Sequence, residues 1–449
     1  RWYASVPPGR CWRVMCSISR PYACFHRPGV TGCPAIARHA VRASVFTFMR
    51  RPGLRAAQLL WLATVVLVTL NLRPFLTAIG PLTPAIQTET GMSLEALAWL
   101  TLLPMVLIGA GTWATPAVQT RLGVRPAMLL ALALIAFGCA LRLAGGVSAV
   151  LIATAVLCGT GVALVQGMLP GLIKFHAPRH VAPMMGVYSA ALMSGGALGA
   201  QVSPLAMQWG LSWQAALALW TGPVLLALAL ARTALDTLPQ PPAAPQNGSD
   251  TRWLLRRRRT WLLMLAFGLM NGGYAMMVAW LAPYYLEQGW SATHSGLLVA
   301  VVSLAQAVAA FVFPLLAARH PDRRPWLWLT LACQAAGFAA LAEWPAVAPM
   351  AAAVVLGVGI GGCFALFMVV ALDHLRHPMQ AGALSALMQG GGFMLTAVAP
   401  WAMARLHETT GGYRAGWLAQ CGAVLLVALL VTRFGPGRYE AAMRPPSRR

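Results

Sequence analysis

The chain has 449 residues, of which 59% are hydrophobic and only 10% are charged, and its formal net charge is +23. A soluble domain carries about 25% charged residues, so this composition excludes an ordinary soluble protein and is typical of a chain that crosses a membrane several times. The excess of arginine does not indicate nucleic-acid binding, because the arginines lie in short segments between apolar runs, as expected for membrane loops.

The amino-terminal segment 1–50 is rich in Arg, Pro and Cys and contains no long apolar run. It lacks the hydrophobic region of a signal peptide, so we expect a basic, disordered extension. Four of the nine cysteines lie there, at spacings that do not match a zinc site.

The first apolar run, 56–85, is long enough to cross a bilayer and contains Asn71, Arg73 and Pro74. A guanidinium near the middle of a membrane costs about 2.5–3.5 kcal/mol on insertion-based scales, and arginine does not lose its proton in proteins. Arg73 therefore needs an acidic partner, backbone carbonyls, water or an anionic ligand. We interpret it as a substrate-facing cation; the alternative is a structural arginine that pairs internally. Pro74 predicts a disturbed helix.

Twelve spans are predicted from apolar length and from breaks at Gly, Pro and charged residues. Their limits are 56–85, 93–117, 124–144, 148–173, 182–207, 212–234, 260–286, 293–317, 325–344, 347–371, 381–405 and 413–434. Basic residues are concentrated in the loops that follow even-numbered spans, which places both termini and the central loop in the cytoplasm. The predicted domains are the extension 1–50, a six-helix bundle 51–236, a cytoplasmic linker 237–259, a second six-helix bundle 260–435 and a basic tail 436–449.

The two halves repeat. Residues 191–196 match 386–391, and residues 222–226 match 422–426, at offsets of 195 to 200 residues. A chance match between Ala-, Leu- and Gly-rich segments is the alternative. The repeat predicts an all-α membrane protein of two pseudo-symmetric six-helix bundles with a site near the midplane between them.

Several further polar or aromatic residues lie inside predicted spans, where an unpaired amide is costly and must face protein or a cavity. Together with the first span they predict a cavity with one cation, several amides and aromatic walls. The candidate substrate-binding residues are Arg73, Asn71, Gln166, Asn271, Tyr274, Trp280 and Gln389. For the candidates in the fourth, seventh and eleventh spans, an interhelical hydrogen bond is the alternative interpretation.

No catalytic constellation or phosphate-binding loop is recognisable, so we expect no enzymatic activity, no cofactor and no metal. The histidines that flank two basic loops are interpreted as solvated residues, and Asp373 as a solvated helix end with proton coupling as the alternative. These histidines are His176, His180, His374 and His377. Transport energy would come from a gradient, with protons as one candidate coupling ion. The expected partners are a small-molecule substrate and the lipid bilayer, and the expected state is a monomer.

The loop Arg121, Gly123 and Arg125 resembles the signature between spans 2 and 3 of the major facilitator superfamily, and is expected to serve in gating. It departs from that signature at Thr120 and Pro116, where Asp and Gly are usual. Within the superfamily, the chain most resembles the cyanate and 2-nitroimidazole transporters. The residues that carry this resemblance are 71–74 with 80–82, 169–174, Tyr274 with 280–283, and 384–389.

The resemblance implies alternating access and a small polar or anionic substrate. We therefore expect a secondary active transporter in the bacterial cytoplasmic membrane, moving a small anion or polar heterocycle that is cyanate- or nitroimidazole-like. A proton-coupled exporter of drugs or toxic compounds is the alternative, but no carboxylate is evident in mid-span. A membrane sensor or scaffold is a third hypothesis.

Overall fold

Helices make up the regular structure of the computed structural model, which describes residues 52–92, 94–239 and 252–444. Within those ranges every regular element is helical. The reason is physical, because a helix satisfies its backbone hydrogen bonds internally and can therefore cross hydrocarbon. The predicted extension 1–50 and most of the predicted linker 237–259 lie outside the described residues.

The amino-terminal half contains the first six predicted spans. Its helices are α1 (Pro52–Leu70), α2 (Pro74–Thr77), α3 (Ile79–Thr90), α4 (Leu94–Leu122), α5 (Val124–Leu141), α6 (Ser148–His176), α7 (Val181–Gln208), α8 (Trp213–Ala218) and α9 (Thr221–Thr237). A short 3-10 helix, η2 (Arg142–Ala144), extends α5.

The carboxy-terminal half contains the other six. Its elements are α10 (Arg252–Leu255), α11 (Arg258–Glu287), α12 (Ala292–Ala317), α13 (Arg324–Glu343), α14 (Pro349–Asp373), α15 (Pro378–Thr396), α16 (Val398–Thr410), α17 (Arg414–Val431), η3 (Pro436–Arg438) and α18 (Tyr439–Ala442). Eleven segments of the described residues are long and apolar enough to span a bilayer. The 29-residue helix α4 supplies the remaining predicted span, so the twelve-helix prediction is confirmed.

Three predicted spans are interrupted. The first is helical to Leu70, loses helical hydrogen bonding at residues 71–73 and resumes as α2 at Pro74. This is the disturbance expected at a proline, which has no N–H to donate and restricts the residue before it. The sixth span is divided between α8 and α9, and the eleventh between α15 and α16.

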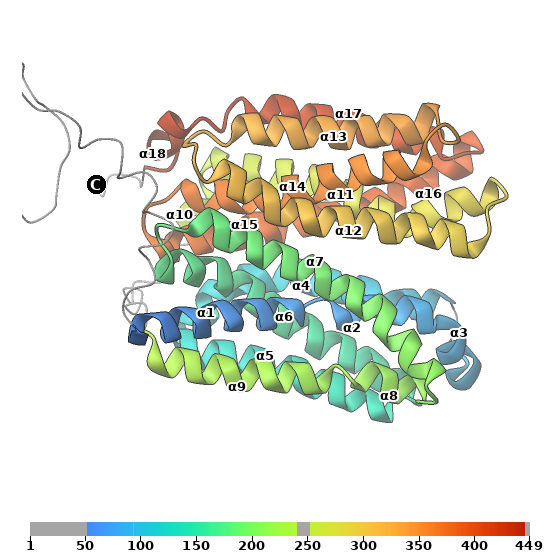
Figure 1. Cartoon of the computed structure of the whole chain (residues 1–449), viewed down its shortest axis with the longest axis horizontal. Helices are drawn as coiled ribbons and strands as arrows, with labels where there is room; N and C mark the ends of the chain where they lie inside the picture. The colour runs from blue at the N-terminus through green and yellow to red at the C-terminus, as the bar shows by residue number, and fades with distance from the viewer. Residues whose placement is uncertain (1–51, 93, 240–251, 445–449) are drawn as a thin grey trace, which may run out of the picture. The chain divides into compact units, whose positions relative to one another are not determined.

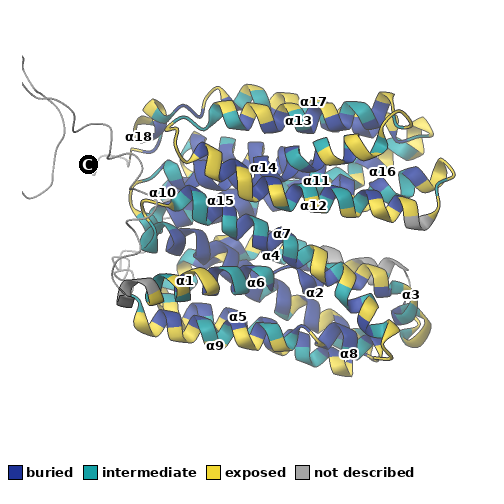
Figure 2. Cartoon of the chain, in the orientation of Figure 1, coloured by how far each residue is buried: buried dark blue, intermediate teal, exposed yellow. Residues whose placement is uncertain are grey.

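The two halves meet along a few helices. In Figure 1 α7 lies beside α12, and α15 packs against both α4 and α6. Every residue of 161–173 in α6 and of 359–372 in α14 is buried, whereas outer helices such as α9 and α17 expose one face (Figure 2). These exposed faces carry apolar side chains such as Leu226 and Leu429, which suits contact with lipid.

Burial follows the sequence repeat. Val224 in α9 and Val424 in α17 are both fully buried, at 0% exposure. Two residues later, Leu226 and Leu426 are 60% and 46% exposed. Equivalent positions of the two halves therefore face inward and outward alike, as two parallel six-helix repeats require.

Small residues set the position of the interrupted first span. A Cβ atom on Gly195 of α7 would overlap the carbonyl oxygen of Leu70, and one on Gly199 would collide with Pro74. Only glycine allows two helix backbones to approach this closely inside a membrane. The break in the first span therefore lies directly against α7.

Candidate intramembrane binding site

Arg73 lies at the break between α1 and α2 and is only 4% exposed. Its Nη1 donates to the Tyr274 hydroxyl oxygen at 3.4 Å, and its guanidinium carbon lies 5.5 Å from the centre of the Tyr274 ring. A charge-assisted hydrogen bond is normally about 2.7–2.9 Å long, so this bond is a weak one. The Nε atom is buried without a partner, and no carboxylate in the described part of the chain forms an ion pair with Arg73.

Tyr188 of α7 is a functional candidate that the sequence analysis missed. Its side chain is completely buried, its hydroxyl has no hydrogen-bond partner among the described residues, and the charge of Arg73 acts on it. A buried tyrosine hydroxyl is usually bonded. The signal in the sequence was a tyrosine inside a span, seven residues before Gly195. We call Arg73, Tyr188 and Tyr274 the Arg73 cluster.

Gln166 and Gln389 form a second polar pair, which joins α6 of one half to α15 of the other. Both are completely buried, and Gln389 Nε2 donates to the backbone oxygen of Gln166 at 3.3 Å. Both side-chain amide atoms of Gln166 and the Oε1 atom of Gln389 are buried without a partner in the described residues. Polar atoms in this condition are available to water or to a ligand.

The other candidate residues form hydrogen bonds within one half. Asn71 Nδ2 donates to the carbonyl oxygens of Leu67 at 2.8 Å and of Pro223 at 3.3 Å. The two carboxy-terminal candidates donate to nearby helices, Asn271 Nδ2 to Thr396 Oγ1 at 3.2 Å and Trp280 Nε1 to the Pro400 oxygen at 3.1 Å. For Asn271 and Trp280, these bonds are the interhelical alternative that the sequence left open.

A second guanidinium, that of Arg142, is buried within the amino-terminal half at 1% exposure. Its Nε donates to Thr154 Oγ1 at 3.4 Å, and its guanidinium carbon lies 5.9 Å from the centre of the Phe75 ring. Both of these contacts lie within the half that contains Arg142. The geometry thus separates Arg142 from Arg73, whose side chain bonds to Tyr274 of the other half.

We call the end of the molecule where α4, α6, α12 and α14 terminate the basic end. Here Lys174 of α6 reaches across to the other half and donates to the carbonyl oxygens of Leu372 and Leu375. These carbonyls lie at the carboxy-terminal end of α14, where a helix leaves acceptors unsatisfied and favours positive charge. The backbone of Gly171 also lies against the other half, since a Cβ on Gly171 would lie 3.1 Å from the Cα of Gly382.

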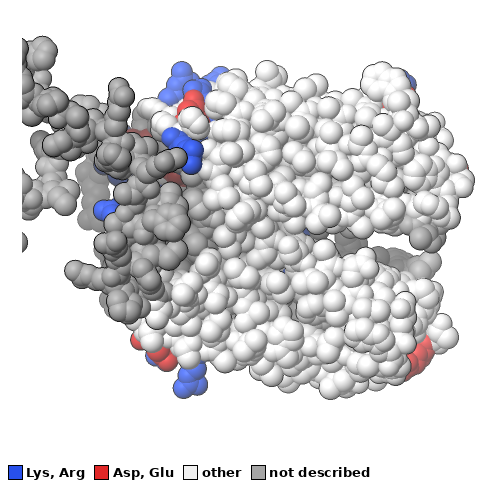
Figure 3. Space-filling view, viewed as in Figure 1, with Lys and Arg blue, Asp and Glu red and all other residues white. Residues whose placement is uncertain are grey.

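Among the described residues, the hydrogen bonds between the two halves lie in the region that runs from Arg73 and Tyr274 to the basic end. They include the bond from Trp113 Nε1 to the Leu387 oxygen, at 3.2 Å. At the far end, Figure 3 shows the surface hollowed between the two halves. On this face the halves are joined at the basic end and parted at the other.

The predicted gating loop connects α4 to α5. Arg121 is exposed, and Gly123 has a φ of 85°, a conformation that favours glycine. Arg125 pairs with Asp236 of α9 at 2.5 Å. This ion pair lies inside the amino-terminal half. The hydrogen bonds of Lys174, by contrast, join the two halves.

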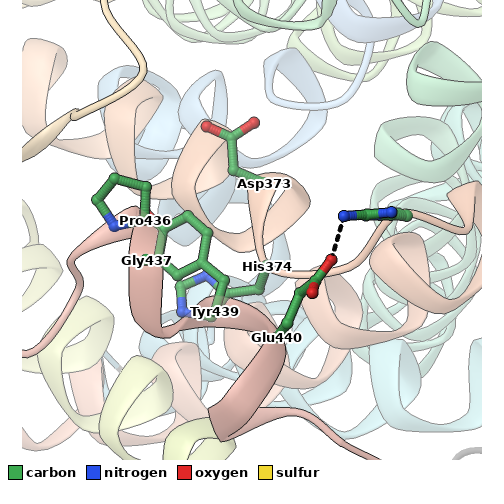
Figure 4. A pocket seen from close by; sticks show the side chains of 7 residues that line it. Asp373, His374, Pro436, Gly437, Tyr439 and Glu440 are labelled. Carbon is green, nitrogen blue, oxygen red and sulfur yellow. Dashed lines mark ion pairs between the residues drawn. The ribbon is translucent and has the colours of Figure 1, made fainter. Parts of the chain in front are cut away.

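A cavity of about 360 Å³ lies at the basic end, outside the Arg73 cluster (Figure 4). Its lining includes Asp373, whose carboxylate pairs with Arg323 at 3.0 Å, and His374, whose ring stacks on Tyr439 with centroids 4.0 Å apart. The prediction that His374 is a solvated loop residue is wrong, because it is only 2% exposed beneath α18. Burial lowers the pKa of His374 to about 4, so its ring is neutral near pH 7.

Comparison with known proteins agrees with this architecture. The Major Facilitator Superfamily family model matches residues 65–377 and 285–449. The chain is 38% identical to the cyanate transport protein CynX of Escherichia coli K12, over 84% of this chain and 98% of that one. It is 28% identical to the 2-nitroimidazole transporter of the same organism, over 83% of this chain and 94% of that one.

Among solved structures, the chain is similar to the proton:xylose symporter XylE, with a TM-score of 0.71 and 14% sequence identity over 85% of this chain and 96% of that chain. That identity supports the fold alone. The relatives and the family model together establish a multi-pass membrane transporter. The chain therefore belongs to the major facilitator superfamily, in the group of carriers that includes the cyanate and 2-nitroimidazole transporters.

Proposed function

We propose that this protein is a secondary active transporter that moves a small anion, or a small heterocycle with an anion-like acceptor group, across the bacterial cytoplasmic membrane. Arg73 is the substrate anchor. The observation that carries the proposal is a guanidinium buried at a helix break, with no paired carboxylate among the described residues and with its Nε hydrogen unused. An intramembrane charge of this kind is retained at a cost and marks a substrate pathway.

The relatives support this choice of substrate class. One is named for cyanate, an anion, and another for a 2-nitroimidazole, whose nitro oxygens are also hydrogen-bond acceptors. A guanidinium offers several N–H donors in a fixed plane, which suits such acceptor groups better than a single ammonium does. A desolvated Arg73 would bind both kinds of ligand by the same chemistry.

The arrangement of the halves supports alternating access. We assign the basic end to the cytoplasm, because the positive-inside rule favours that side for basic loops. With that orientation, the Lys174 contacts close the cytoplasmic side, and the hollow in Figure 3 opens to the outside. Rocking of the two halves about the Arg73 cluster would then expose the site to each side in turn. Protons remain the candidate coupling ion.

An exporter of hydrophobic drugs is the second candidate. That function predicts a titrating carboxylate near the middle of the membrane. In the described spans the carboxylates lie near helix ends, as Asp236, Glu287 and Asp373 do. We therefore favour the small-anion carrier.

Counterflow in proteoliposomes tests the proposal. Vesicles loaded with unlabelled cyanate, and separately with 2-nitroimidazole, are diluted into the labelled compound, using wild-type protein and the variant Arg73→Lys. The planar donor array is lost in the variant while the charge remains, so we expect counterflow to fall by about 100-fold, equivalent to about 2.7 kcal/mol. Arg405→Lys is the matched control, because Arg405 pairs with Glu408 at an exposed site. Wild-type counterflow by Arg73→Lys with every substrate would refute the anchor role.

A further inference from the structure

We propose that the Tyr188 hydroxyl is a second hydrogen-bond donor to the ligand held by Arg73, so that the site favours ligands with hydrogen-bond acceptor groups. The inference rests on the proposed function, because it names a specificity-determining residue of the same site. Tyr188 belongs to α7, whereas Arg73 and Tyr274 belong to the first span and α11.

The register of α7 places Tyr188 on the face that packs against the first span. Gly195 and Gly199 lie seven and eleven residues after Tyr188, which corresponds to about two and three helical turns. Gly195 abuts Leu70, and a Cβ on Gly196 would lie 3.5 Å from the Cβ of Arg73. The glycine face of α7 therefore leads from the helix break to Tyr188.

Tyr188 lies eight residues nearer the basic end of α7 than Gly196 does, on the face of the helix that carries Gly195 and Gly199. The positive charge of Arg73 acts on the buried phenol.

The fold provides no hydrogen-bond partner for the hydroxyl of Tyr188 among the described residues. The ring is completely buried, yet its oxygen has no partner among the described residues. The hydroxyl of Tyr284 in α11, by contrast, donates to the Leu341 oxygen at 2.7 Å. An unbonded buried hydroxyl destabilises a protein relative to phenylalanine at the same position, and a ligand that accepts its hydrogen removes that penalty.

The Arg73 cluster is lined by donors. Arg73 has an unused N–H, Tyr188 an unused O–H, and the oxygen of Tyr274 already accepts from Arg73, which leaves the Tyr274 hydrogen to donate. Such a cluster fits an atom or group with lone pairs and negative charge, for example either end of a linear anion or a nitro group. The guanidinium has no acceptor, so a group with lone pairs can satisfy every donor of the cluster, whereas an N–H could be accepted only by a tyrosine oxygen.

The test compares Tyr188→Phe with Tyr284→Phe. Binding of cyanate and of 2-nitroimidazole to purified protein is measured by isothermal titration calorimetry, and thermal stability is measured without ligand. For Tyr188→Phe we expect affinity to fall by about 10- to 100-fold, the loss expected for one hydrogen bond to a charged group. We expect its melting temperature without ligand to be equal to or above wild type. Tyr284→Phe should lower the melting temperature and leave affinity unchanged.

Affinity of Tyr188→Phe within twofold of wild type for both ligands would overturn the inference, whatever its melting temperature. This failure differs from failure of the proposed function. If Arg73→Lys loses counterflow while Tyr188→Phe binds normally, Arg73 remains the anchor and Tyr188 has no part in recognition. If both variants bind and transport normally, the small-anion site itself is wrong.

Discussion

Two cations in the spans face the opposite half of the molecule, and their surroundings differ. Lys174, at the basic end, donates to two carbonyl oxygens at the end of α14. Arg73, at the helix break, has one weak bond to Tyr274 and an unused Nε. One cation is satisfied by the protein, and the other is left with free donors.

This difference separates two roles for a charge inside a membrane. A cation whose donors are satisfied across an interface stabilises the conformation in which that interface is closed. A cation whose donors are free costs stability until a ligand binds it. Lys174 is therefore expected to control conformation, and Arg73 is expected to control recognition.

The largest expected effect separates stability from function at Arg73. In Arg73→Met the buried, poorly bonded charge is removed, so the free energy of unfolding should rise by about 1–3 kcal/mol while transport falls to background. Thermal melts in detergent and counterflow in proteoliposomes measure the two effects. A lower melting temperature would mean that Arg73 is bonded structurally, and would remove the contrast with Lys174.

Lys174→Met should have the opposite effect on stability. Loss of the ammonium leaves the carbonyl oxygens of Leu372 and Leu375 without their donor and weakens closure by about 1.5–3 kcal/mol, or about 10- to 100-fold in the conformational equilibrium. Hydrogen–deuterium exchange should increase in residues 165–176 and 368–375. Lys174→Arg, which keeps the charge and the donors, is the control. Unchanged exchange in Lys174→Met would show that the bond does not hold the halves together.

A change without charge sharpens the comparison further. In Gly171→Ala the new methyl group would lie 3.1 Å from the Cα of Gly382, so the halves should part at the basic end as they do in Lys174→Met, by about 1–3 kcal/mol. The same exchange experiment measures this effect. Gly222→Ala is the matched control, because nothing lies within 4 Å of a Cβ there. If the two alanine variants show equal hydrogen–deuterium exchange, the contact at Gly171 does not affect how tightly the halves close at the basic end.

The smallest effect concerns pH at the basic end. Because burial lowers the pKa of His374 to about 4, below the ordinary value of 6.5, the unfolded chain binds a proton between these values that the folded chain does not. Stability is therefore fully present above pH 6.5 and declines as pH falls towards 4. Between pH 7.5 and 6 the loss should be about 1 kcal/mol or less. Melting curves of wild type and His374→Phe measure it, and an equal decline in both would assign it to other groups.

Much of the fold was predictable because its signals are local. The length of apolar runs gave the spans, and Pro74 predicted the interrupted first helix. The repeat was visible in residues 222–226 and 422–426, and equivalent burial at Val224 and Val424 confirms it. Each of these inferences needs only a short stretch of sequence.

The partners of polar groups were not predictable in the same way. The sequence marked Asn271, Trp280 and Gln389 as equally polar or aromatic, but Asn271 and Trp280 bond within their own half while Gln389 bonds across the interface. It also placed His374 in solvent, although α18 covers it. A single sequence does not specify which helices, separated by a hundred residues or more, bring their side chains together.

The sequence by itself determined that this is a twelve-span membrane protein with an arginine inside its first span, because hydrocarbon imposes length, composition and charge rules on each segment separately. Only the tertiary structure decided that Arg73 lacks a carboxylate among the described residues, that Tyr188 is buried with an unused hydroxyl, and that Lys174 joins the two halves. Those facts depend on how helices pack, since the cost of a buried polar atom is set by the neighbours that packing supplies.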